Sequence, residues 1–403
     1  MNLSPELLAG VAADDPRALY LAARQAAALA EHAQAWAWFA RAAERGLPAA
    51  ATECGLYLLY GMNGDVDVAR AEMVLRSAAN AGHPEAAYWC VVLGLQQGLT
   101  GADRAQLAAD WVMAVEGNER RAARALGICG AAHPDPALRR AALDLLELIA
   151  RAGDESTQDL LARIDAEEDQ TLSEEVLADI VYDDPEPPTR AQLIALAKHA
   201  LTPPNASPRV LDAGIGLAVL PGVVSRPERQ WAQILAGARL TPAEIVDPAT
   251  GERQRHPARS NREAGFDHSV LDLNVRLIEA KMADFAGHPL IHGETLTVLC
   301  YGPGEEYRPH RDDLPAVRVA ADPSGQRIVT VLAYLGAAER GGETDFPKLG
   351  IKVPSTPGDL LRFRTVDAEG KTLVNALHAG CPVLSGEKWV ASLWVRERPY
   401  REF

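Results

Sequence analysis

Three side chains that can bind a metal stand in the C-terminal half of the sequence: His310 and Asp312, one residue apart, and His378. If residues 310–312 are extended, His310 and Asp312 project from the same face of the strand and can hold one ion between them. A third ligand from His378 would complete a set of two imidazoles and one carboxylate. Such a set binds one face of a metal ion, typically Fe(II), and leaves the opposite coordination positions open for reactants.

The segments around these residues follow a definite order. A strand-like apolar run, Thr295–Cys300, leads into the segment that contains the two adjacent ligands, and a second such run follows at Arg327–Leu335. Further short segments, separated by turn-forming residues, follow at 341–347, 357–363, 378–383 and 386–389. The composition predicts a mostly-β domain with supporting helices, in which several strands position the ligands.

Residues from about Leu220 to Arg398 resemble the catalytic domain of the prolyl 4-hydroxylases, which are 2-oxoglutarate- and Fe(II)-dependent dioxygenases. The resemblance rests on Gly-Gly-Glu-Thr-x-Phe-Pro at 341–347, on His-Ala-Gly-x-Pro-Val-x-x-Gly-x-Lys-Trp at 378–389, and on the order of the pieces. It implies a double-stranded β-helix (jelly-roll) fold, with Fe(II), 2-oxoglutarate and O2 as cofactor and cosubstrates and ascorbate as a further candidate. It also implies that His310, Asp312 and His378 are the metal ligands and the catalytic centre.

The resemblance places 2-oxoglutarate on Lys388, ten residues after His378. If this segment is extended, the even spacing puts both side chains on one face, and the ammonium can then pair with the far carboxylate of the cosubstrate. Arg396 is the next cation to test. Tyr301 aligns with a tyrosine that hydrogen-bonds the cosubstrate, and Tyr334 is the alternative on the following strand.

Contacts to the substrate are assigned to Tyr307, Trp394 and Arg259. Tyr307 and Trp394 fall where prolyl hydroxylases contact peptide, and aromatic faces suit a proline ring in an extended segment. Both side chains could instead be core residues of the barrel. Arg259 lies in an Arg-x-Ser segment that resembles one of the family, and its role is either loop structure or substrate binding.

Residues 1–165 read as helix, with abundant alanine and apolar residues recurring at intervals of three and four. Glycines that follow alanine-rich helices recur at 46, 82, 117 and 153, at intervals of 36, 35 and 36 residues. Helix, glycine turn and helix at this period predict a solenoid of helical pairs. The repeats resemble Sel1-like repeats, relatives of the tetratricopeptide repeat, and the alternative is an irregular helical bundle.

The predicted organisation is therefore an α+β multidomain protein with three parts. They are a helical repeat domain at 1–165, an acidic and proline-rich linker with a short helix at 166–210, and the dioxygenase domain at 211–403. Within the last two parts we expect helices at Arg190–Ala200, Arg226–Gly237 and Ser269–Phe285, and a strand and turn at Ile245–Glu252. We also expect the repeats to form a separate unit that contributes nothing to the chemistry.

Composition narrows the class of protein. The formal net charge is −15, with 30 acidic and 16 basic residues in 1–200, which disfavours nucleic acid as a partner. No run of eighteen apolar residues is present, and the N-terminus lacks a basic and then apolar leader, so we expect no membrane association and a cytoplasmic location. Five dispersed cysteines without a Cys-x-x-Cys pair argue against a disulfide framework and a zinc site. The oligomeric state is left open.

The leading functional hypothesis is hydroxylation of a prolyl residue in a peptide or protein, with the repeats recruiting the partner. An alternative keeps the chemistry but takes a free amino acid or a peptide natural product as substrate. A third reading is a catalytically silent scaffold, against which the intact set of His310, Asp312, His378 and Lys388 argues. The repeats favour a macromolecular substrate, because a solenoid has little to hold on a small molecule.

Overall fold

The computed structural model describes residues 3–168, 184–246, 253–256, 258–267 and 271–403. The chain divides into two compact units. The first, called here the helical unit, comprises Met1–Gly94, Asp103–Ala123 and Glu402–Phe403. The second, called the sheet unit, comprises Leu95–Ala102 and Arg124–Arg401.

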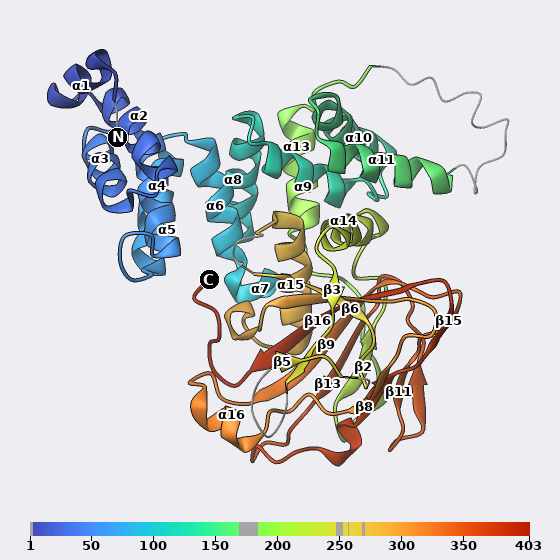
Figure 1. Ribbon diagram of the computed structural model, residues 1–403. Helices are drawn as coiled ribbons and strands as arrows, with labels where there is room; N and C mark the ends of the chain where they lie inside the picture. Colours follow the sequence, from blue (N-terminus) through green and yellow to red (C-terminus); the bar gives the residue numbers. More distant parts are fainter. Residues whose placement is uncertain (1–2, 169–183, 247–252, 257, 268–270) are drawn as a thin grey trace. The chain divides into compact units, whose positions relative to one another are not determined.

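The helical unit is built from consecutive helices, each packed on the next (Figure 1). They are α1 (Pro5–Ala12), α2 (Pro16–Ala28), α3 (His32–Glu44), α4 (Pro48–Tyr60), α5 (Val68–Asn80), α6 (Pro84–Gly94) and α8 (Arg104–Glu116), and α9 (Arg120–Gly130) begins in this unit. Side chains of Ser4, Asp15, Asp67 and Asp103 accept hydrogen bonds from backbone N–H groups at helix starts, which fixes where the helices begin. The predicted helical pairs are confirmed.

The periodic glycines do not all work in the same way. Gly46, Gly82 and Gly153 adopt φ of +82°, +84° and +91°, as expected for left-handed residues that end helices. At the third turn the left-handed residue is instead Asn118, with φ +62°. Gly117 has an ordinary helical φ, and a Cβ there would collide with the ring of Pro84. Its glycine is therefore required by close packing and not by backbone conformation.

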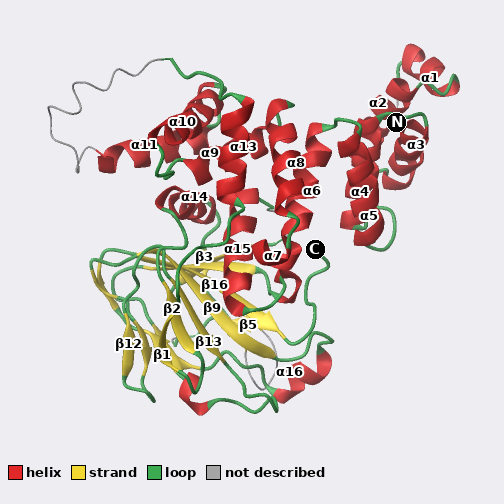
Figure 2. Cartoon of the chain, turned by 180° about the vertical axis from the view of Figure 1, so that it is seen from behind, coloured by secondary structure: helices red, strands yellow, loops and turns green. Residues whose placement is uncertain are grey.

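The sheet unit contains strands in two larger and two smaller sheets (Figure 2). The strands are β1 (Arg209–Asp212), β2 (Leu217–Leu220), β3 (Thr241–Pro242), β4 (Ile245–Val246), β5 (Arg253–Gln254), β6 (Arg262–Phe266), β7 (Leu296–Tyr301), β8 (Tyr307–His310), β9 (Arg327–Gly336), β10 (Arg340–Gly341), β11 (Thr344–Phe346), β12 (Ile351–Val353), β13 (Leu360–Arg364), β14 (His378–Gly380), β15 (Val383–Ser385) and β16 (Lys388–Arg396). Its helices are α7 (Gly98–Gly101), α10 (Pro136–Arg151), α11 (Glu155–Glu168), α13 (Arg190–Ala200), α14 (Arg226–Gly237), α15 (Leu273–Ala286) and α16 (Ala316–Ala321), with short 3-10 turns at Leu95–Gln97, Leu290–His292 and Val374–Ala376.

The main sheet has eight strands in the order β1-β2-β13-β9-β16-β7-β6-β3, and a four-stranded sheet has the order β12-β11-β14-β8. All pairings within them are antiparallel. The alternation of side chains gives the main sheet two apolar faces. On β9, Val331 and Ala333 pack in the cluster that contains α15, whereas Leu332 and Tyr334 pack in the cluster shared with the four-stranded sheet. Two antiparallel sheets facing each other across an apolar core confirm the predicted jelly-roll organisation.

The division between the units differs from the predicted domain limits of 1–165, 166–210 and 211–403. Trp231 of α14 is 1% exposed and is buried among Ile128, Leu146 and Leu160, which come from α9, α10 and α11. The last helices of the repeat region therefore share a hydrophobic core with α14, because without them the apolar face of α14 around Trp231 would be exposed to water. Part of the predicted linker, 169–183, lies outside the described residues.

Other expected elements compare closely with the structure. The helices at Arg190–Ala200 and Arg226–Gly237 are confirmed as α13 and α14. The helix predicted from Ser269 begins at Leu273 in the described residues, after an Asp272 cap. Of the expected strand at Ile245–Glu252, residues 245–246 are β4, and 247–252 lie outside the described residues. Among described helices, none combines the length and the apolar composition needed to cross a bilayer.

Candidate active site

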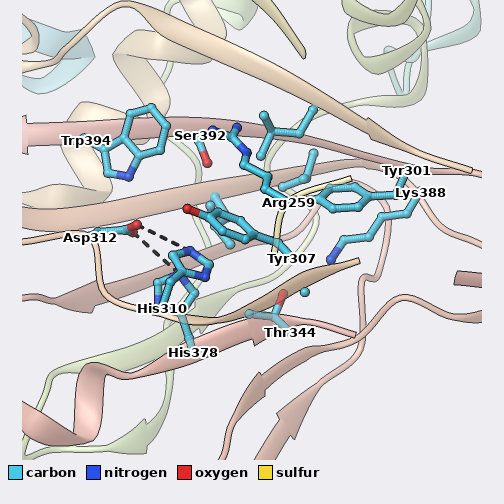
Figure 3. Close-up of a pocket in the computed structure, with 14 residues that line it drawn as sticks. Arg259, Tyr301, Tyr307, His310, Asp312, Thr344, His378, Lys388, Ser392 and Trp394 are labelled. Atoms are coloured by element: carbon cyan, nitrogen blue, oxygen red, sulfur yellow. Dashed lines mark ion pairs between the residues drawn. The ribbon is translucent and has the colours of Figure 1, made fainter. Parts of the chain in front are cut away.

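One pocket of the sheet unit gathers nearly all the residues selected from the sequence (Figure 3). It lies between the inner faces of the two larger sheets, and its lining residues are Arg259, Leu299, Tyr301, Tyr307, His310, Asp312, Leu332, Thr344, His378, Gly380, Lys388, Val390, Ser392 and Trp394. Of the predicted site residues only Tyr334 is absent from this lining. Its hydroxyl donates a hydrogen bond to the hydroxyl of Thr344, 2.9 Å away, and Thr344 does line the pocket.

The three predicted metal ligands come together at the end of the β8–β14 pair. One ligand atom from each of His310, Asp312 and His378 lies within 4.8 Å of the other two. The Nε2 atom of His310 is 3.6 Å from Oδ1 of Asp312, and the Nε2 atom of His378 is 3.6 Å from Oδ2. The described residues contain no other group of three such side chains. The arrangement is that of two imidazoles and one carboxylate directed at a common point.

Backbone carbonyls fix the orientation of both imidazoles. The Nδ1 atom of His310 lies 2.8 Å from the carbonyl oxygen of Arg308, and that of His378 lies 3.0 Å from the carbonyl oxygen of Ala376. Because a carbonyl oxygen can only accept, Nδ1 donates in each ring and Nε2 keeps its lone pair. This is the tautomer that a histidine needs to bind a metal through Nε2.

The charges of the three groups also suit a cation. Burial and the neighbouring His378 lower the pKa of His310, so its imidazole is neutral at pH 7. Burial on its own would raise the pKa of Asp312, but His378, His310 and Arg327 outweigh it and the pKa falls. Asp312 is therefore a carboxylate at pH 7, and it presents a negative charge beside the neutral imidazole of His310.

Lys388 supplies a cation at the other end of the pocket. It is the register partner of Tyr301 across β16 and β7, and its ammonium lies 5.4 Å from the Tyr301 ring and 5.9 Å from the Tyr334 ring. The side chain is 3% exposed, and burial lowers its pKa to about 8. No carboxylate of the described chain forms an ion pair with it. A buried ammonium without an anionic partner is costly, so the site fits a ligand that brings its own carboxylate.

Arg396, the second cation considered, is already engaged. Its guanidinium pairs with Glu294 at 3.0 Å and Asp322 at 2.8 Å and donates to the carbonyl oxygen of Gly325. It is absent from the pocket lining. Of the two cations considered for a distant carboxylate, Lys388 lines the pocket and Arg396 does not.

The three predicted substrate contacts have different surroundings. Tyr307 stacks on the imidazole of His310, with centroids 3.5 Å apart and planes 13° apart. The guanidinium of Arg259 lies over the Tyr307 ring, 5.0 Å from its centroid, and pairs with Glu263 at 2.6 Å. Arg259 also donates to the carbonyl oxygen of Glu244. Its contacts hold the loop and the Tyr307 ring in place, which favours the structural role among the two considered.

Trp394 lines the pocket and has an unused polar atom. Its indole Nε1 is buried and has no acceptor in the described part of the chain. The guanidinium of Arg327 lies 4.3 Å from its ring centroid and pairs with Glu294. The indole is therefore held rigidly at the pocket wall with a hydrogen-bond donor to offer, which suits contact with a polar substrate and does not suit a purely core role.

Several residues of the site were not selected from the sequence. Ser392 lies on the same face of β16 as Lys388 and Trp394, and the interval of two or four residues could have indicated it. Thr330 on β9 is the register partner of Trp394 and donates a hydrogen bond to Asp312. That partnership depends on strand register, which no local pattern discloses.

Comparison with known proteins agrees with this geometry. Residues 296–396 match the family model described as the 2OG-Fe(II) oxygenase superfamily. The chain is 32% identical over 208 residues to prolyl 4-hydroxylase 1 of Arabidopsis thaliana, covering 48% of this chain and 73% of the plant protein. It is 33% identical over 184 residues to the prolyl 4-hydroxylase α-1 subunit of Rattus norvegicus, which is 44% of this chain and 33% of that subunit.

Two solved structures are similar to different extents. The viral collagen prolyl hydroxylase of Paramecium Bursaria Chlorella virus-1, in its 2OG complex, is 28% identical and aligns over 45% of this chain and 95% of its own, with a TM-score of 0.36. A Sel1 repeat protein from Oxalobacter formigenes is 21% identical and aligns over 39% of this chain and 66% of its own, with a TM-score of 0.31.

Proposed function

Because the chain belongs to the 2OG-Fe(II) oxygenase superfamily, and within it to the prolyl 4-hydroxylases, we propose that it hydroxylates a prolyl residue of a peptide or protein at the pocket between its two larger sheets. It is a 2-oxoglutarate-dependent dioxygenase whose cofactor is Fe(II) and whose cosubstrates are 2-oxoglutarate and O2. We propose which residues bind these ligands, and we propose a prolyl peptide as the substrate.

His310, Asp312 and His378 would hold the iron, and Lys388 would pair with the far carboxylate of 2-oxoglutarate. Fe(II), when bound, supplies the redox chemistry that couples decarboxylation of 2-oxoglutarate to succinate and CO2 with hydroxylation of a C–H bond. Tyr301 would donate a hydrogen bond to the cosubstrate. Its hydroxyl forms no hydrogen bond within the described chain, and the residue lines the pocket, which supports this role. Tyr334 is the weaker candidate, because its hydroxyl is already donated to Thr344.

The remaining pocket residues would position the reactants and exclude water. Leu299, Leu332 and Val390 form an apolar stretch of wall between the Lys388 end and the triad end of the pocket. Apolar walls favour the dry environment in which charge pairing with a cosubstrate is strong. Tyr307 and Trp394 would face the substrate, with the Trp394 N–H available to a peptide carbonyl.

The observation that carries the proposal is the buried ammonium of Lys388, without an ion-pair partner in the described chain, in the same pocket as the triad. A metal site alone would fit many reactions. A metal site together with a recessed cation fits a small dicarboxylate that reaches from one to the other.

The test is succinate release from 2-oxoglutarate in the presence of Fe(II), across a panel of proline-containing peptides, matched alanine-for-proline peptides and free amino acids. Mass spectrometry of the peptides should show one added oxygen on proline. Turnover stimulated by free amino acids but by no peptide would move the assignment to the small-molecule alternative. Absence of 2-oxoglutarate conversion with every substrate would favour a silent scaffold.

We further propose that the helical unit recruits the protein substrate. A cavity in this unit is lined by Trp36 of α3, Tyr57 of α4, Arg70 of α5 and the loop that carries Asp65 and Asp67. Aromatic faces beside exposed carboxylates suit a basic side chain on an extended peptide. We therefore propose this cavity as the docking site for the protein substrate.

The recruitment test uses the full chain with Trp36→Ala combined with Asp65→Asn. Loss of docking lowers the effective concentration of the target segment, so turnover of a protein substrate should fall while turnover of a short peptide stays unchanged. Met73→Ala, an exposed position on α5, is the matched control. Equal turnover of the protein substrate by all three proteins would remove the cavity from the proposal. Ascorbate as a further candidate cofactor and the cytoplasmic location remain predictions.

A further inference from the structure

Thr330 is a buried residue of β9 that the proposed chemistry does not yet use. Its side chain is fully buried, and its hydroxyl donates a hydrogen bond of 2.7 Å to Oδ2 of Asp312. A hydroxyl has a single proton, so this contact uses its whole donor capacity. The bond is charge-assisted because Asp312 is ionised, and such bonds are about twice as strong as neutral ones.

The two oxygens of Asp312 are therefore not equivalent. Oδ1 lies 3.6 Å from Nε2 of His310 and accepts no hydrogen bond in the described chain, whereas Oδ2 lies at the same distance from Nε2 of His378 but is engaged by Thr330. A hydrogen bond draws electron density from the oxygen that accepts it and makes that oxygen the poorer metal donor. The geometry leaves Oδ1 as the better ligand atom.

Thr330 is itself held from several sides. It is the register partner of Trp394 on β16, and the Trp394 ring is covered by the guanidinium of Arg327. The guanidinium of Arg327 is bound through two hydrogen bonds of 2.7 Å to Glu294 and also approaches the backbone carbonyl oxygen of Asp312 at 3.5 Å. These contacts connect the strand that carries the hydroxyl with the backbone of its acceptor, Asp312.

We propose that Thr330 is a positioning residue that confines Asp312 to binding the metal through Oδ1 alone. A carboxylate that binds through both oxygens occupies one more coordination position than one that binds through a single oxygen. Confinement to Oδ1 keeps that position open for the bidentate end of 2-oxoglutarate. The inference rests on the proposed metal role of the triad and adds to it a residue that decides how many positions the triad leaves free.

The proposal predicts that Thr330→Val affects the affinity for 2-oxoglutarate much more than the affinity for the metal. Loss of a group that supports a metal ligand typically costs 10–100-fold in metal affinity or activity. In Thr330→Val the freed Oδ2 can bind the metal itself, so metal affinity should change by less than about threefold. The dissociation constant for 2-oxoglutarate should instead rise about tenfold or more, because the freed oxygen competes for its position.

The experiment uses the full chain, loaded anaerobically with Co(II), as wild type, Thr330→Val, Thr330→Ser and Thr157→Val. Calorimetry gives the dissociation constants of Co(II) and then of 2-oxoglutarate, and the visible absorption of Co(II) reports a change in coordination. Thr157 is the matched control, since it is fully buried and its hydroxyl donates to Asp154 at 2.9 Å, away from the pocket. Thr330→Ser keeps the hydroxyl and should restore wild-type values.

Retained Co(II) affinity with weakened 2-oxoglutarate binding and an altered Co(II) spectrum in Thr330→Val alone is the supporting result. Equal loss of both affinities would mean that Thr330 only stabilises the fold of the site, and wild-type affinities would mean that it does not constrain Asp312. Either result overturns the inference. Failure of the wild-type protein to bind Co(II) would instead count against the proposed metal site itself, so the two failures are distinguishable.

Discussion

His310 on β8 and His378 on β14 are direct register partners in an antiparallel pair, and their ring centroids lie 4.3 Å apart. Strand pairing thereby brings two residues far apart in the sequence next to each other, with their ring planes tilted by 55°. Backbone carbonyls set the tautomer of each ring. The pairing therefore brings two nitrogen donors of the proposed metal site together.

Replacing either His310 or His378 by alanine should abolish turnover of 2-oxoglutarate, with a loss of about 100-fold or more, because two remaining ligands hold iron weakly. Mn(II) or Co(II) should bind the wild-type site without supporting turnover. The measurement is succinate release together with calorimetric metal binding. His133→Ala, in the loop before α10, is the control and should behave as wild type. Unchanged turnover in a triad variant would refute the assignment.

Lys388→Ala should weaken 2-oxoglutarate binding while leaving metal affinity unchanged. The lost bond to a charged group is worth about 1.5–3 kcal/mol, which corresponds to roughly tenfold to more than a hundredfold in the dissociation constant. Calorimetric titration of 2-oxoglutarate into Mn(II)-loaded protein measures the effect. Lys352→Ala, an exposed lysine on β12, provides the comparison. A normal 2-oxoglutarate affinity in Lys388→Ala would mean that another donor binds the far carboxylate.

Binding of 2-oxoglutarate should weaken as pH rises through about 8. Burial lowers the pKa of Lys388 to about 8 in the free protein, so the ammonium loses its proton above that pH. If only the charged form pairs with the cosubstrate, the dissociation constant is constant well below pH 8. It then rises about tenfold per pH unit well above it.

The matching control for this pH dependence is Lys388→Arg, whose guanidinium stays charged throughout. Its dissociation constant should be flat between about pH 7 and 9.5 even if its absolute affinity is lower. Titration of the Mn(II)-loaded proteins across this range is the measurement. The same pH dependence in both proteins would place the titrating group elsewhere.

Substitutions of Tyr301 and Tyr334, the two tyrosines near Lys388, should have different effects, one on 2-oxoglutarate binding and the other on stability. Tyr301→Phe removes a hydroxyl that is free to bind the cosubstrate, and should raise the 2-oxoglutarate dissociation constant about fivefold for a bond of about 1 kcal/mol. Tyr334→Phe removes the bond to Thr344 and should lower the free energy of unfolding by about 1 kcal/mol instead. Calorimetry of 2-oxoglutarate binding and urea unfolding are measured for both variants. If Tyr334→Phe weakened 2-oxoglutarate binding and Tyr301→Phe only lowered the free energy of unfolding, the two roles would be exchanged.

Trp231→Ala should destabilise the protein strongly. The indole is buried among Ile128, Leu146 and Leu160, lies 4.7 Å from the Arg124 guanidinium and donates to Asp272 at 3.1 Å. Truncation of such a side chain costs about 3–5 kcal/mol. Urea unfolding measures it, with the exposed Leu384→Ala as a control expected within about 0.5 kcal/mol of wild type.

The same contacts around Trp231 determine whether a protein shortened at its N-terminus can fold. A chain beginning at Arg190 would leave the apolar face around Trp231 uncovered, and we expect it to fold poorly and to lose 2-oxoglutarate turnover. That expectation departs from the simpler prediction that the whole region 1–165 is dispensable for chemistry. Full background turnover in such a shortened protein would restore the simpler view.

The chemistry of this protein was readable from the sequence because its key residues sit in short local patterns. One residue separates His310 from Asp312, and Lys388 follows His378 within a single short segment of strand and turn. Alternation along a strand then places such residues on one face without further information. The helices Arg190–Ala200 and Arg226–Gly237 could also be predicted from neighbouring residues, since capping residues and periodicity indicate where they begin and end.

Only the tertiary structure decided which of these residues contact one another and which already form ion pairs elsewhere. The register of β9 against β16 sets Thr330 beside Trp394, and long-range pairing commits Arg396 to Glu294 and Arg259 to Glu263. The same holds for α9–α11, whose helical pattern is that of a repeat but whose apolar face is buried on Trp231. Periodicity specifies that a face is apolar and leaves open what covers it, because the covering partner is chosen by contacts distant in the sequence.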